Sequence, residues 1–415
     1  MTVDSVPRLG HDVDLTDPVH HAERDLSSLW QWLRSHEPVA WHPYSGAPEG
    51  FWVVATYRAA TEVYRDSERF TSRHGNVLAT LLNGGDSAGG RMLAVADGPR
   101  HQTIRRQLLR SFTASALAST RERITAAARE LVERAASKQT CDFAKDVAAR
   151  IPLMAICDLL EIPEKDHELM YRHGSTSLAA YSPDAAAEDS RLARNEILLY
   201  FAQLIRARAD LPGESILGRL VEMMDSEVQL ELDELLFNCY SLLLGGDETT
   251  RLAMIGAVKA FSEMPSEWER LRRGEVPIPM AVEEILRWTS PVLHGGRTAT
   301  ADTVLEGKDI AAGDVVVVWN NSANFDGEQF PAPGRFDLSR APNRHLSFAY
   351  GPHYCLGAAL ARIELTALLE ALLEFVQDMS VTGTPQRVYS NFGSGFHSLP
   401  VQLEPRAERL KGSSR

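Results

Sequence analysis

Cysteines are few and widely spaced in this sequence. The 415 residues include four of them, with no paired spacing and no Cys-x-x-Cys: Cys141, Cys157, Cys239 and Cys355. This pattern excludes the spacings of a disulfide framework or a zinc site, and scattered cysteines are typical of the reducing cytosol. The N-terminus also lacks the positive start and apolar core of a signal peptide. We therefore expect a cytoplasmic protein.

Long apolar runs and an excess of positive charge are missing as well. The apolar stretch at 235–244 is interrupted by Asn238 and Ser241, and it is much shorter than the roughly 20 residues that a membrane-spanning helix needs. The formal net charge is −13, whereas a general nucleic-acid binder needs a basic surface to displace counterions from phosphates. With 44% hydrophobic and 24% charged residues, the composition is that of a globular protein. We expect it to bind neither a membrane nor nucleic acid.

Helical periodicity dominates what is present. Apolar residues recur at helical spacing in five main segments: 115–136, 192–209, 233–263, 280–288 and 358–375. Two portions rich in β-branched and aromatic residues predict strands: 39–55, with a turn at 45–48, and 303–319, with Gly313-Asp314 between two apolar runs. No linker separates these parts. The sequence predicts a mainly α fold with minor β, in a single domain over 1–415 whose first roughly 24 and last roughly 10 residues are peripheral.

The segment before the last long helix carries the first chemical motif. It reads Phe348-Ala349-Tyr350-Gly351-Pro352-His353-Tyr354-Cys355-Leu356-Gly357. A cysteine where a tight loop opens into a helix is favoured as the thiolate by the helix dipole and by nearby backbone N–H groups. Gly351 and Gly357 leave room for a flat macrocycle to lie against the backbone. A lone cysteine is more often a buried structural residue, so the flanking pattern decides between the two interpretations.

This segment resembles the haem-binding loop of the cytochromes P450, whose pattern is Phe-Gly-x-Gly-x-His-x-Cys-x-Gly. It departs from the pattern only at Ala349, where the family usually has Gly. The resemblance implies a cytochrome P450 fold, extending from about residue 25 to about residue 405, and a bound haem b (iron protoporphyrin IX) with the Cys355 thiolate as its axial ligand. It also implies that Phe348 and Gly357 lie against the haem.

A second motif lies inside the helical segment 233–263. It reads Leu242-Leu243-Leu244-Gly245-Gly246-Asp247-Glu248-Thr249-Thr250, and each glycine in a helix costs about 1 kcal/mol relative to alanine. Taken alone, it indicates either the end of one helix and the start of the next, or a helix that admits a ligand against its backbone. The motif resembles the oxygen-binding part of the family's long central helix. By that resemblance, Glu248 and Thr249 are catalytic and deliver protons to dioxygen.

Two further sets gain meaning from their order along the chain. Glu284 and Arg287, spaced as i, i+3, resemble a buried pair of the family, and Arg335 resembles the arginine that joins it from the following loop, so we expect a structural role for all three. A second departure from the family lies at Phe325, where Arg is usual. The other set resembles the residues that hold the two haem propionates, because carboxylates suit arginine and histidine donors: His101, Arg105, Arg297 and His353.

The resemblance implies that the protein activates dioxygen to hydroxylate or oxidatively couple an organic substrate. No Gly-x-Gly-x-x-Gly fingerprint of a flavin or nicotinamide domain is present, so electrons must come from outside the chain. A ferredoxin and its ferredoxin reductase are the donors that the resemblance implies. Four arginines are candidates for docking an acidic ferredoxin, or else are ordinary solvated charges: Arg100, Arg106, Arg110 and Arg362.

The substrate expected is a small molecule. The resemblance places the pocket wall in the segments 78–92, 243–246, 292–295 and 392–396, with these candidates: Leu243, Gly245, Val292, His294 and Phe392. The Gly-rich segment 84–90 and the motif around Thr249 are similar to those of bacterial members that tailor peptide-type specialised metabolites, as in antibiotic biosynthesis. Some of those members act on amino acids tethered to a carrier protein. A free dipeptide, terpenoid or polyketide is the alternative.

Two other classes of function stay open. One is a haem-thiolate peroxygenase or isomerase, which needs no proton relay to dioxygen, so the Glu248-Thr249 pair argues against it. The other is a non-catalytic haem sensor, and no spare segment is long enough for an output domain. The sequence therefore favours a monooxygenase.

Overall fold

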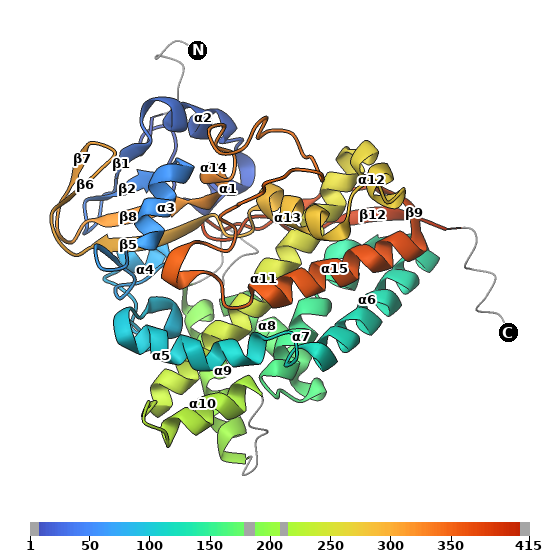
Figure 1. Ribbon diagram of the computed structural model, residues 1–415, viewed down its shortest axis with the longest axis horizontal. Coiled ribbons are helices and arrows are strands. Elements are labelled where there is room, and N and C mark those ends of the chain that lie inside the picture. The colour runs from blue at the N-terminus through green and yellow to red at the C-terminus, as the bar shows by residue number, and fades with distance from the viewer. Residues whose placement is uncertain (1–7, 178–186, 208–214, 407–415) are drawn as a thin grey trace.

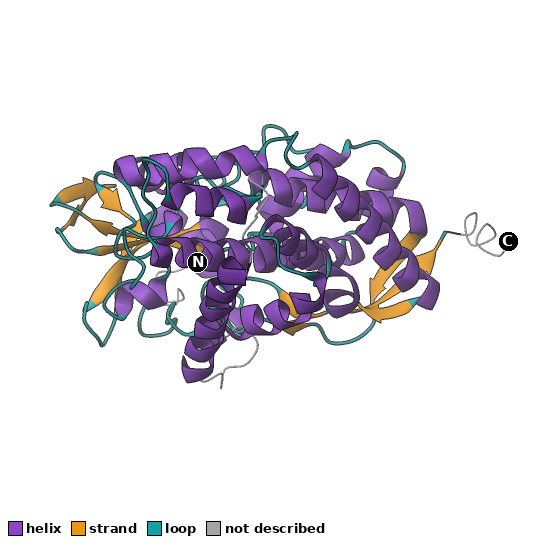
Figure 2. Cartoon of the chain, turned by 90° about the horizontal axis from the view of Figure 1, so that it is seen from below, coloured by secondary structure: helices purple, strands orange, loops and turns teal. Residues whose placement is uncertain are grey.

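Helices fill the middle of the molecule, and short strands lie at its two ends (Figure 2). The structure is a computed structural model that describes residues 8–177, 187–207 and 215–406. The helices are α1 (Pro18–Glu23), α2 (Ser27–His36), α3 (Tyr57–Arg65), α4 (Leu78–Leu82), α5 (Gly98–Leu109), α6 (Ala118–Lys138), α7 (Ile151–Leu159), α8 (His167–Ser177), α9 (Ala187–Ala207), α10 (Ile216–Met224), α11 (Leu232–Glu263), α12 (Pro265–Arg272), α13 (Ile278–Thr289), α14 (Asn320–Ala323) and α15 (Ala358–Phe375). The strands are β1 (Val39–Pro43), β2 (Gly50–Val54), β3 (Phe70–Thr71), β4 (Thr140–Asp142), β5 (His294–Ala299), β6 (Thr303–Leu305), β7 (Lys308–Ile310), β8 (Val315–Trp319), β9 (Val376–Val381), β10 (Gln386–Arg387), β11 (Phe396–Ser398) and β12 (Pro400–Pro405). The predicted mainly α fold with minor β is confirmed.

The motif around Thr249 lies in the long helix α11, and the Cys355 motif forms the loop that leads into the long helix α15 (Figure 1). Helix α15 covers the predicted segment 358–375, which consists almost throughout of strong helix formers. Helix α11 continues unbroken through Gly245 and Gly246, so the interpretation of this motif as a helix end followed by a helix start is wrong. A Cβ on Gly246 would lie 2.6 Å from Cγ1 of Ile156, and glycine there allows α7 to pack closely against α11.

The other predicted helices are also present. The segments 115–136 and 280–288 correspond to α6 and α13, with ends shifted by a few residues, as is usual because helix ends fray. The segment 192–209 corresponds to α9, and its residues 208 and 209 lie outside the described residues.

The two β portions that the sequence predicts separately form one sheet. Strands β1 and β2 pair as the expected antiparallel hairpin, with Trp41 opposite Trp52. Strand β2 then pairs in parallel with β8, so that Trp52 lies opposite Val316. The strand order is β1-β2-β8-β5-β3, and the short hairpin β6–β7 precedes β8. At the other end of the molecule, β12 joins β4 and β9.

Part of the N-terminal segment belongs to the core. Val13 and Leu15 are buried against the sheet and α2, and the backbone N–H of Leu15 donates to Nε2 of buried His42 at 3.0 Å. The structure thus places residues 13–15 closer to the core than the sequence suggested. Residues 1–7 and 407–415, the rest of the termini expected to be peripheral, lie outside the described residues. No helix in the described part of the chain has the length and apolar character to cross a membrane.

Candidate functional site

The loop before α15 is shaped by two unusual backbone conformations. Gly351 has φ +70°, and a Cβ there would lie 2.6 Å from the carbonyl oxygen of Tyr64, so only glycine fits. Ala349 has φ +57°, in the left-handed region that glycine adopts without strain and that costs another residue about 1 kcal/mol. The backbone N–H of Cys355 donates to the carbonyl of Phe348 at 2.9 Å and closes the loop. The replacement of the family's glycine by Ala349 therefore leaves the loop formed but strained.

Cys355 is the one exposed cysteine of the four. Desolvation raises the pKa of its thiol, whereas the backbone N–H of Gly357 and the positive charges of Arg105 and Arg362 act in the opposite direction. A Cβ on Gly357 would meet only the Cys355 sulfur, 4.0 Å away. Cys355 thus lies at an exposed position, and its thiol faces groups that stabilise the thiolate.

The four residues predicted for the propionates come together beside this loop. The rings of His101 and His353 lie 4.4 Å apart between centroids, and a guanidinium N–H of Arg105 donates to the carbonyl of Tyr354. Desolvation is the largest cause that lowers the pKa of His101 to about 4. The positive charges of His353, Arg105 and the buried Arg297 lower it further. These cationic and donor groups form a site that suits carboxylates.

His101 provides a test of whether a ligand fits this site. Its Nε2 is buried and has no hydrogen-bond partner in the structure, although buried polar atoms are nearly always paired. A flat macrocycle with two carboxylates and a metal would use the Cys355 sulfur, the free Nε2 of His101 and the two guanidinium groups of Arg105 and Arg297 together. The residues present therefore fit haem.

The predicted acid and alcohol lie on α11 in different surroundings. Glu248 is buried and forms an ion pair with Arg251, whose guanidinium also donates to the Tyr171 hydroxyl at 3.2 Å. Thr249 donates its hydroxyl to the carbonyl of Gly245 at 3.1 Å. Gly245 is exposed, and a Cβ there would meet nothing within 4 Å. This turn of α11 thus has a hydroxyl and open space near it, with a charged carboxylate one residue away.

Two buried acids close to this turn were not found from the sequence. Asp247 and Glu364, on α11 and α15, are almost completely buried, and three of their carboxyl oxygens have no hydrogen-bond partner of good geometry. Burial raises the pKa of Asp247 to about 7, with Arg251 opposing and Glu248 adding to the rise. Burial likewise raises the pKa of Glu364, opposed by a hydrogen bond from Thr250 and increased by Asp247. Burial therefore favours the protonated form of Glu364.

A sequence signal for one of these acids does exist. Glu364 is an acid on an otherwise apolar face of α15, between Leu360 and Leu368, which are both buried. An acid at helical spacing among core residues is uncommon because burial disfavours its charge. Asp247 gives no such signal, because another acid, Glu248, follows it directly in the sequence.

The Glu284–Arg287 pair is completely buried, as the resemblance implied. Arg287 Nε and Nη2 each donate to a Glu284 oxygen at 2.8 Å. The third member of the network is Arg340, whose Nε donates to Glu284 at 3.1 Å. Arg335 was expected in this role, but its side chain is exposed and only its carbonyl takes part, as an acceptor from Arg287.

The course of the loop between Arg335 and Arg340 explains why Arg340, and not Arg335, reaches Glu284. The backbone N–H of Asp337 donates to Glu284 at 2.9 Å, which turns the chain so that Arg340 returns to the carboxylate. Phe325, where the family usually has Arg, lies with its ring 5.0 Å from the Arg287 guanidinium carbon. An aromatic face at this distance is a favourable neighbour for a buried cation.

The residues predicted to line a substrate pocket have varied surroundings. Leu243 is buried, Gly245 is exposed, and Val292 forms an isolated bridge with Gly393. The backbone N–H of Leu293 donates to the carbonyl of Phe392 at 2.8 Å. These bonds fix the segments 292–295 and 392–396 against each other, as a shared wall requires.

His294 is held from both sides by the protein. Its Nε2 accepts from the backbone N–H of Leu78 at 2.9 Å, and its Nδ1 lies 2.9 Å from the carbonyl of Asn391. Desolvation lowers its pKa to about 3, so the ring is neutral. With both nitrogens occupied, His294 ties α4 to the turn at 392–396.

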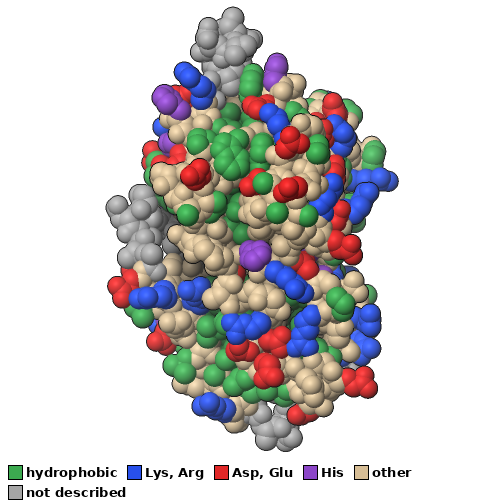
Figure 3. All heavy atoms as spheres, turned by 90° about the vertical axis from the view of Figure 1, so that its left-hand side faces the viewer, with side chains coloured by type: hydrophobic (Ala, Val, Ile, Leu, Met, Phe, Trp, Pro, Cys, Tyr) green, Lys and Arg blue, Asp and Glu red, His purple; other side chains and the backbone are tan. Residues whose placement is uncertain are grey.

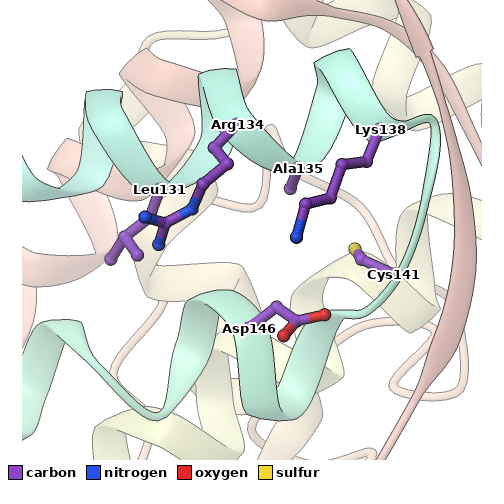
Figure 4. A pocket seen from close by; sticks show the side chains of 6 residues that line it. All are labelled: Leu131, Arg134, Ala135, Lys138, Cys141 and Asp146. Carbon is purple, nitrogen blue, oxygen red and sulfur yellow. The ribbon is translucent and has the colours of Figure 1, made fainter.

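A separate pocket of about 230 Å³ lies at the end of α6. Figure 4 shows that it is lined by Leu131, Arg134, Ala135, Lys138, Cys141 and Asp146. Burial, followed by the charges of Asp146 and Asp142, raises the pKa of the Cys141 thiol to about 12. A thiol of this kind is a poor nucleophile at neutral pH, and none of the predicted site residues lines the pocket.

Comparison with known proteins agrees with this site. The family model for cytochrome P450 matches residues 278–404. The chain is 44% identical to cytochrome P450 NovI of Streptomyces niveus over 391 residues, which cover 94% of this chain and 96% of that one. It is 33% identical to a steroid C26-monooxygenase of Rhodococcus jostii (strain RHA1), over 96% of this chain and 86% of that one. The crystal structure of P450 OxyD, which is involved in the biosynthesis of vancomycin-type antibiotics, is similar with a TM-score of 0.86 and 34% identity, over 95% of this chain and 100% of that one.

The chain belongs to the cytochrome P450 family, and it is a monooxygenase. Its cofactor is haem with a cysteine thiolate ligand, for which the structure offers Cys355. When bound, a thiolate-ligated haem iron supplies the activation of dioxygen. The remaining chemistry depends on how the residues of the chain bind the substrate and move protons.

Proposed function

We propose that this enzyme binds haem b through Cys355 and hydroxylates or oxidatively couples an amino acid or peptide-type substrate in the biosynthesis of a specialised metabolite, as in antibiotic biosynthesis. The substrate we propose first is an amino acid tethered to a carrier protein. The Gly-rich segment 84–90 and the motif around Thr249 support this substrate class, and the 44% identity to NovI over nearly the whole chain supports the cytochrome P450 family. The similarity to OxyD, an enzyme of vancomycin-type antibiotic biosynthesis, supports the same class of pathway.

Thr249 and Glu248 are the groups that we assign to proton delivery. The Thr249 hydroxyl donates to the Gly245 carbonyl, so its oxygen lone pairs remain able to accept a proton from water and to pass one on. Glu248 is held beside Arg251 by an ion pair. Together they form an acid–alcohol pair at the exposed turn of α11.

A spin-state titration of the purified holoenzyme tests the substrate class. One series uses an amino acid covalently bound to its carrier protein, and the other uses the same free amino acid, its dipeptides and small terpenoids and polyketides. We expect a low-to-high-spin shift with the tethered amino acid at micromolar concentration and none with the free one. Unloaded carrier protein serves as the control. A shift with a free molecule alone would replace the carrier-bound substrate by that molecule.

We further propose that a ferredoxin and its ferredoxin reductase supply the electrons, in the cytoplasm. Two of the four arginines considered for docking are engaged within the chain, Arg100 with Glu234 and Arg362 with Glu283. Arg106 on α5 and Arg110 directly after it are exposed. Arg105 of the same helix contacts the Cys355 loop. Charges of both signs are interspersed on the face shown in Figure 3, so docking depends on a local patch. The four free cysteines support a reducing compartment.

Charge reversal tests this docking site. The double variant Arg106→Glu/Arg110→Glu is expected to slow reduction by a ferredoxin about tenfold at low salt, with the difference shrinking as salt screens the charges. Arg134→Glu, an exposed arginine on α6, is the matched control. Equal rates for all three proteins would place the electron donor elsewhere on the surface.

A further inference from the structure

Asp97 is the N-cap residue of α5, yet its carboxylate does not cap that helix. An aspartate in this position normally accepts a hydrogen bond from a backbone N–H of the first turn and so stabilises the helix by about 1 kcal/mol. Asp17 does this at the start of α1, where it accepts from the N–H of Val19 at 2.8 Å. The Asp97 side chain is therefore used for something other than its own helix.

The carboxylate of Asp97 joins three parts of the chain. Its Oδ2 accepts from the hydroxyl of Thr71 at 2.6 Å and from the backbone N–H of Ser72 at 2.8 Å, at the end of β3. Its Oδ1 accepts from Nε2 of His353 at 2.8 Å, in the Cys355 loop. The start of α5, the end of β3 and the Cys355 loop thus meet at one side chain.

Asp97 is an ionised carboxylate in a buried position. Only 7% of the residue is exposed, and burial alone would raise its pKa. The hydrogen bonds from His353, Thr71 and Ser72 outweigh that effect and hold the pKa at about 2. Hydrogen bonds to a charged acceptor are stronger than those between neutral groups. The junction is therefore held firmly at pH values where Asp97 is ionised.

The ring that Asp97 holds is one of the stacked pair at the propionate site. His353 lies against His101 with ring centroids 4.4 Å apart, and the buried Nε2 of His101 has no hydrogen-bond partner. The neighbours of His353 in its loop, Pro352 and Tyr354, are exposed. The Nε2 of His353 also lies 3.3 Å from the Ser72 hydroxyl. Its shorter hydrogen bond, to Asp97, fixes the direction of the His353 ring.

We propose that Asp97 is a positioning residue of the haem site, which holds His353 against His101 so that both rings meet the haem propionates in a fixed arrangement. Asp97 acts through His353 and does not itself bind the propionates. This inference rests on the haem site and not on the identity of the substrate. Removal of the partner that orients a metal-binding histidine changes metal affinity by about 10- to 100-fold, and we take this range as the guide for a histidine that holds a propionate.

The rate of haem transfer from the ferric holoenzyme to excess apomyoglobin tests the proposal without any turnover. We expect Asp97→Ala to speed this transfer about tenfold, the lower end of that range. Asp17→Ala, which also removes an N-cap aspartate, is the matched control and is expected to leave the rate unchanged. If Asp97→Ala does not fold, Asp97→Asn serves in its place, because the amide keeps the shape and loses the charge and one acceptor.

A double-variant cycle separates positioning from a general loss of stability. Because Asp97 acts through His353, the variant Asp97→Ala/His353→Ala should lose haem no faster than His353→Ala alone. The same cycle is made with Asp97→Asn if that variant is used. A multiplicative effect of the two substitutions would show that Asp97 acts independently of His353 and would overturn the proposal, as would an unchanged transfer rate in the Asp97 variants.

Discussion

Glu284 and Arg287 form a two-pronged ion pair in which both side chains are completely buried. A buried pair of this kind does not by itself add much stability, because desolvation offsets the attraction. The cost of breaking it is large, however, because the remaining charge has no water around it. Glu284 also accepts from Arg340 and Asn343, so its removal would leave several donors unpaired.

We therefore expect Glu284→Ala to lower the free energy of unfolding by about 3–5 kcal/mol and to sharply reduce the yield of haem-loaded protein. Glu188→Ala is the control, because Glu188 pairs with Arg191 at the same i, i+3 spacing but both side chains are more than 60% exposed. Its effect should stay within about 0.5 kcal/mol. Urea unfolding measures both, and equal losses would contradict a special role for the buried pair.

Ala349→Gly should stabilise the protein. Ala349 has φ +57°, and glycine adopts this conformation without strain, so we expect a gain of about 1 kcal/mol. Ala126→Gly, on an exposed face in the middle of α6, should instead cost about 1 kcal/mol. Thermal unfolding of the two variants should thus shift in opposite directions, and a loss of stability in both would refute the strain at Ala349.

Cys355→Ala should remove the carbon monoxide difference spectrum of a thiolate-ligated haem. Cys239→Ala is the matched control, because Cys239 is buried in α11 and burial raises the pKa of its thiol. A thiolate-type spectrum that survives Cys355→Ala would rule out this cysteine as the axial ligand.

Thr249→Ala should keep the haem and lose coupling. Without the hydroxyl, we expect product formed per electron pair to fall about tenfold, with a matching release of hydrogen peroxide. Thr250→Val is the control, because the Thr250 hydroxyl lies beside Glu364. The measurement compares consumed reductant, peroxide and product. Full coupling in Thr249→Ala would end its assignment as a proton donor.

Because of Asp247, the free energy of unfolding should decrease as the pH rises. Burial raises the pKa of Asp247 from 3.8 to about 7 in the folded protein, so between pH 4 and 7 the native state binds a proton that the unfolded state has lost. The free energy of unfolding therefore decreases over this range, by about 4 kcal/mol in all, and this contribution is constant above pH 7.

Asp247→Asn is neutral at every pH and should lack this decrease. The difference in the free energy of unfolding between this variant and the wild type should therefore grow from pH 4 to pH 7 and stay constant above it. Asp309→Asn, at an exposed position, is the control. Urea unfolding at a series of pH values gives the comparison, and parallel curves for Asp247→Asn and the wild type would contradict the assignment.

The sequence predicts those features of this molecule that depend on local pattern. Helical spacing locates α11 and α15 to within a residue or two, and the loop around Cys355 is found from glycine, histidine and cysteine at fixed intervals. The arginine that joins Glu284 could not be found in this way. Arg335 and Arg340 are both in the following loop, and which of them returns to Glu284 depends on the turn at Asp337.

The sequence could not predict contacts between segments that are far apart along the chain. Asp247 and Glu364 lie on different helices and interact because α11 packs on α15. An aspartate before a helix, such as Asp97, predicts a cap, and only the structure shows that its carboxylate binds His353 instead. The roles of Glu248 and Thr249 in proton delivery stay predictions until the coupling experiment is made.

The pairing of β2 with β8 has a consequence for synthesis of the chain. The partner of Trp52 is Val316, so the β1–β2 hairpin leaves the ribosome long before the strand that completes its sheet. At about 5–20 residues per second, this interval is of the order of 10–50 s. Throughout it, the inner edge of β2 exposes unpaired backbone groups that can pair with another nascent chain. Production together with a chaperone that covers exposed strand edges should therefore raise the soluble yield.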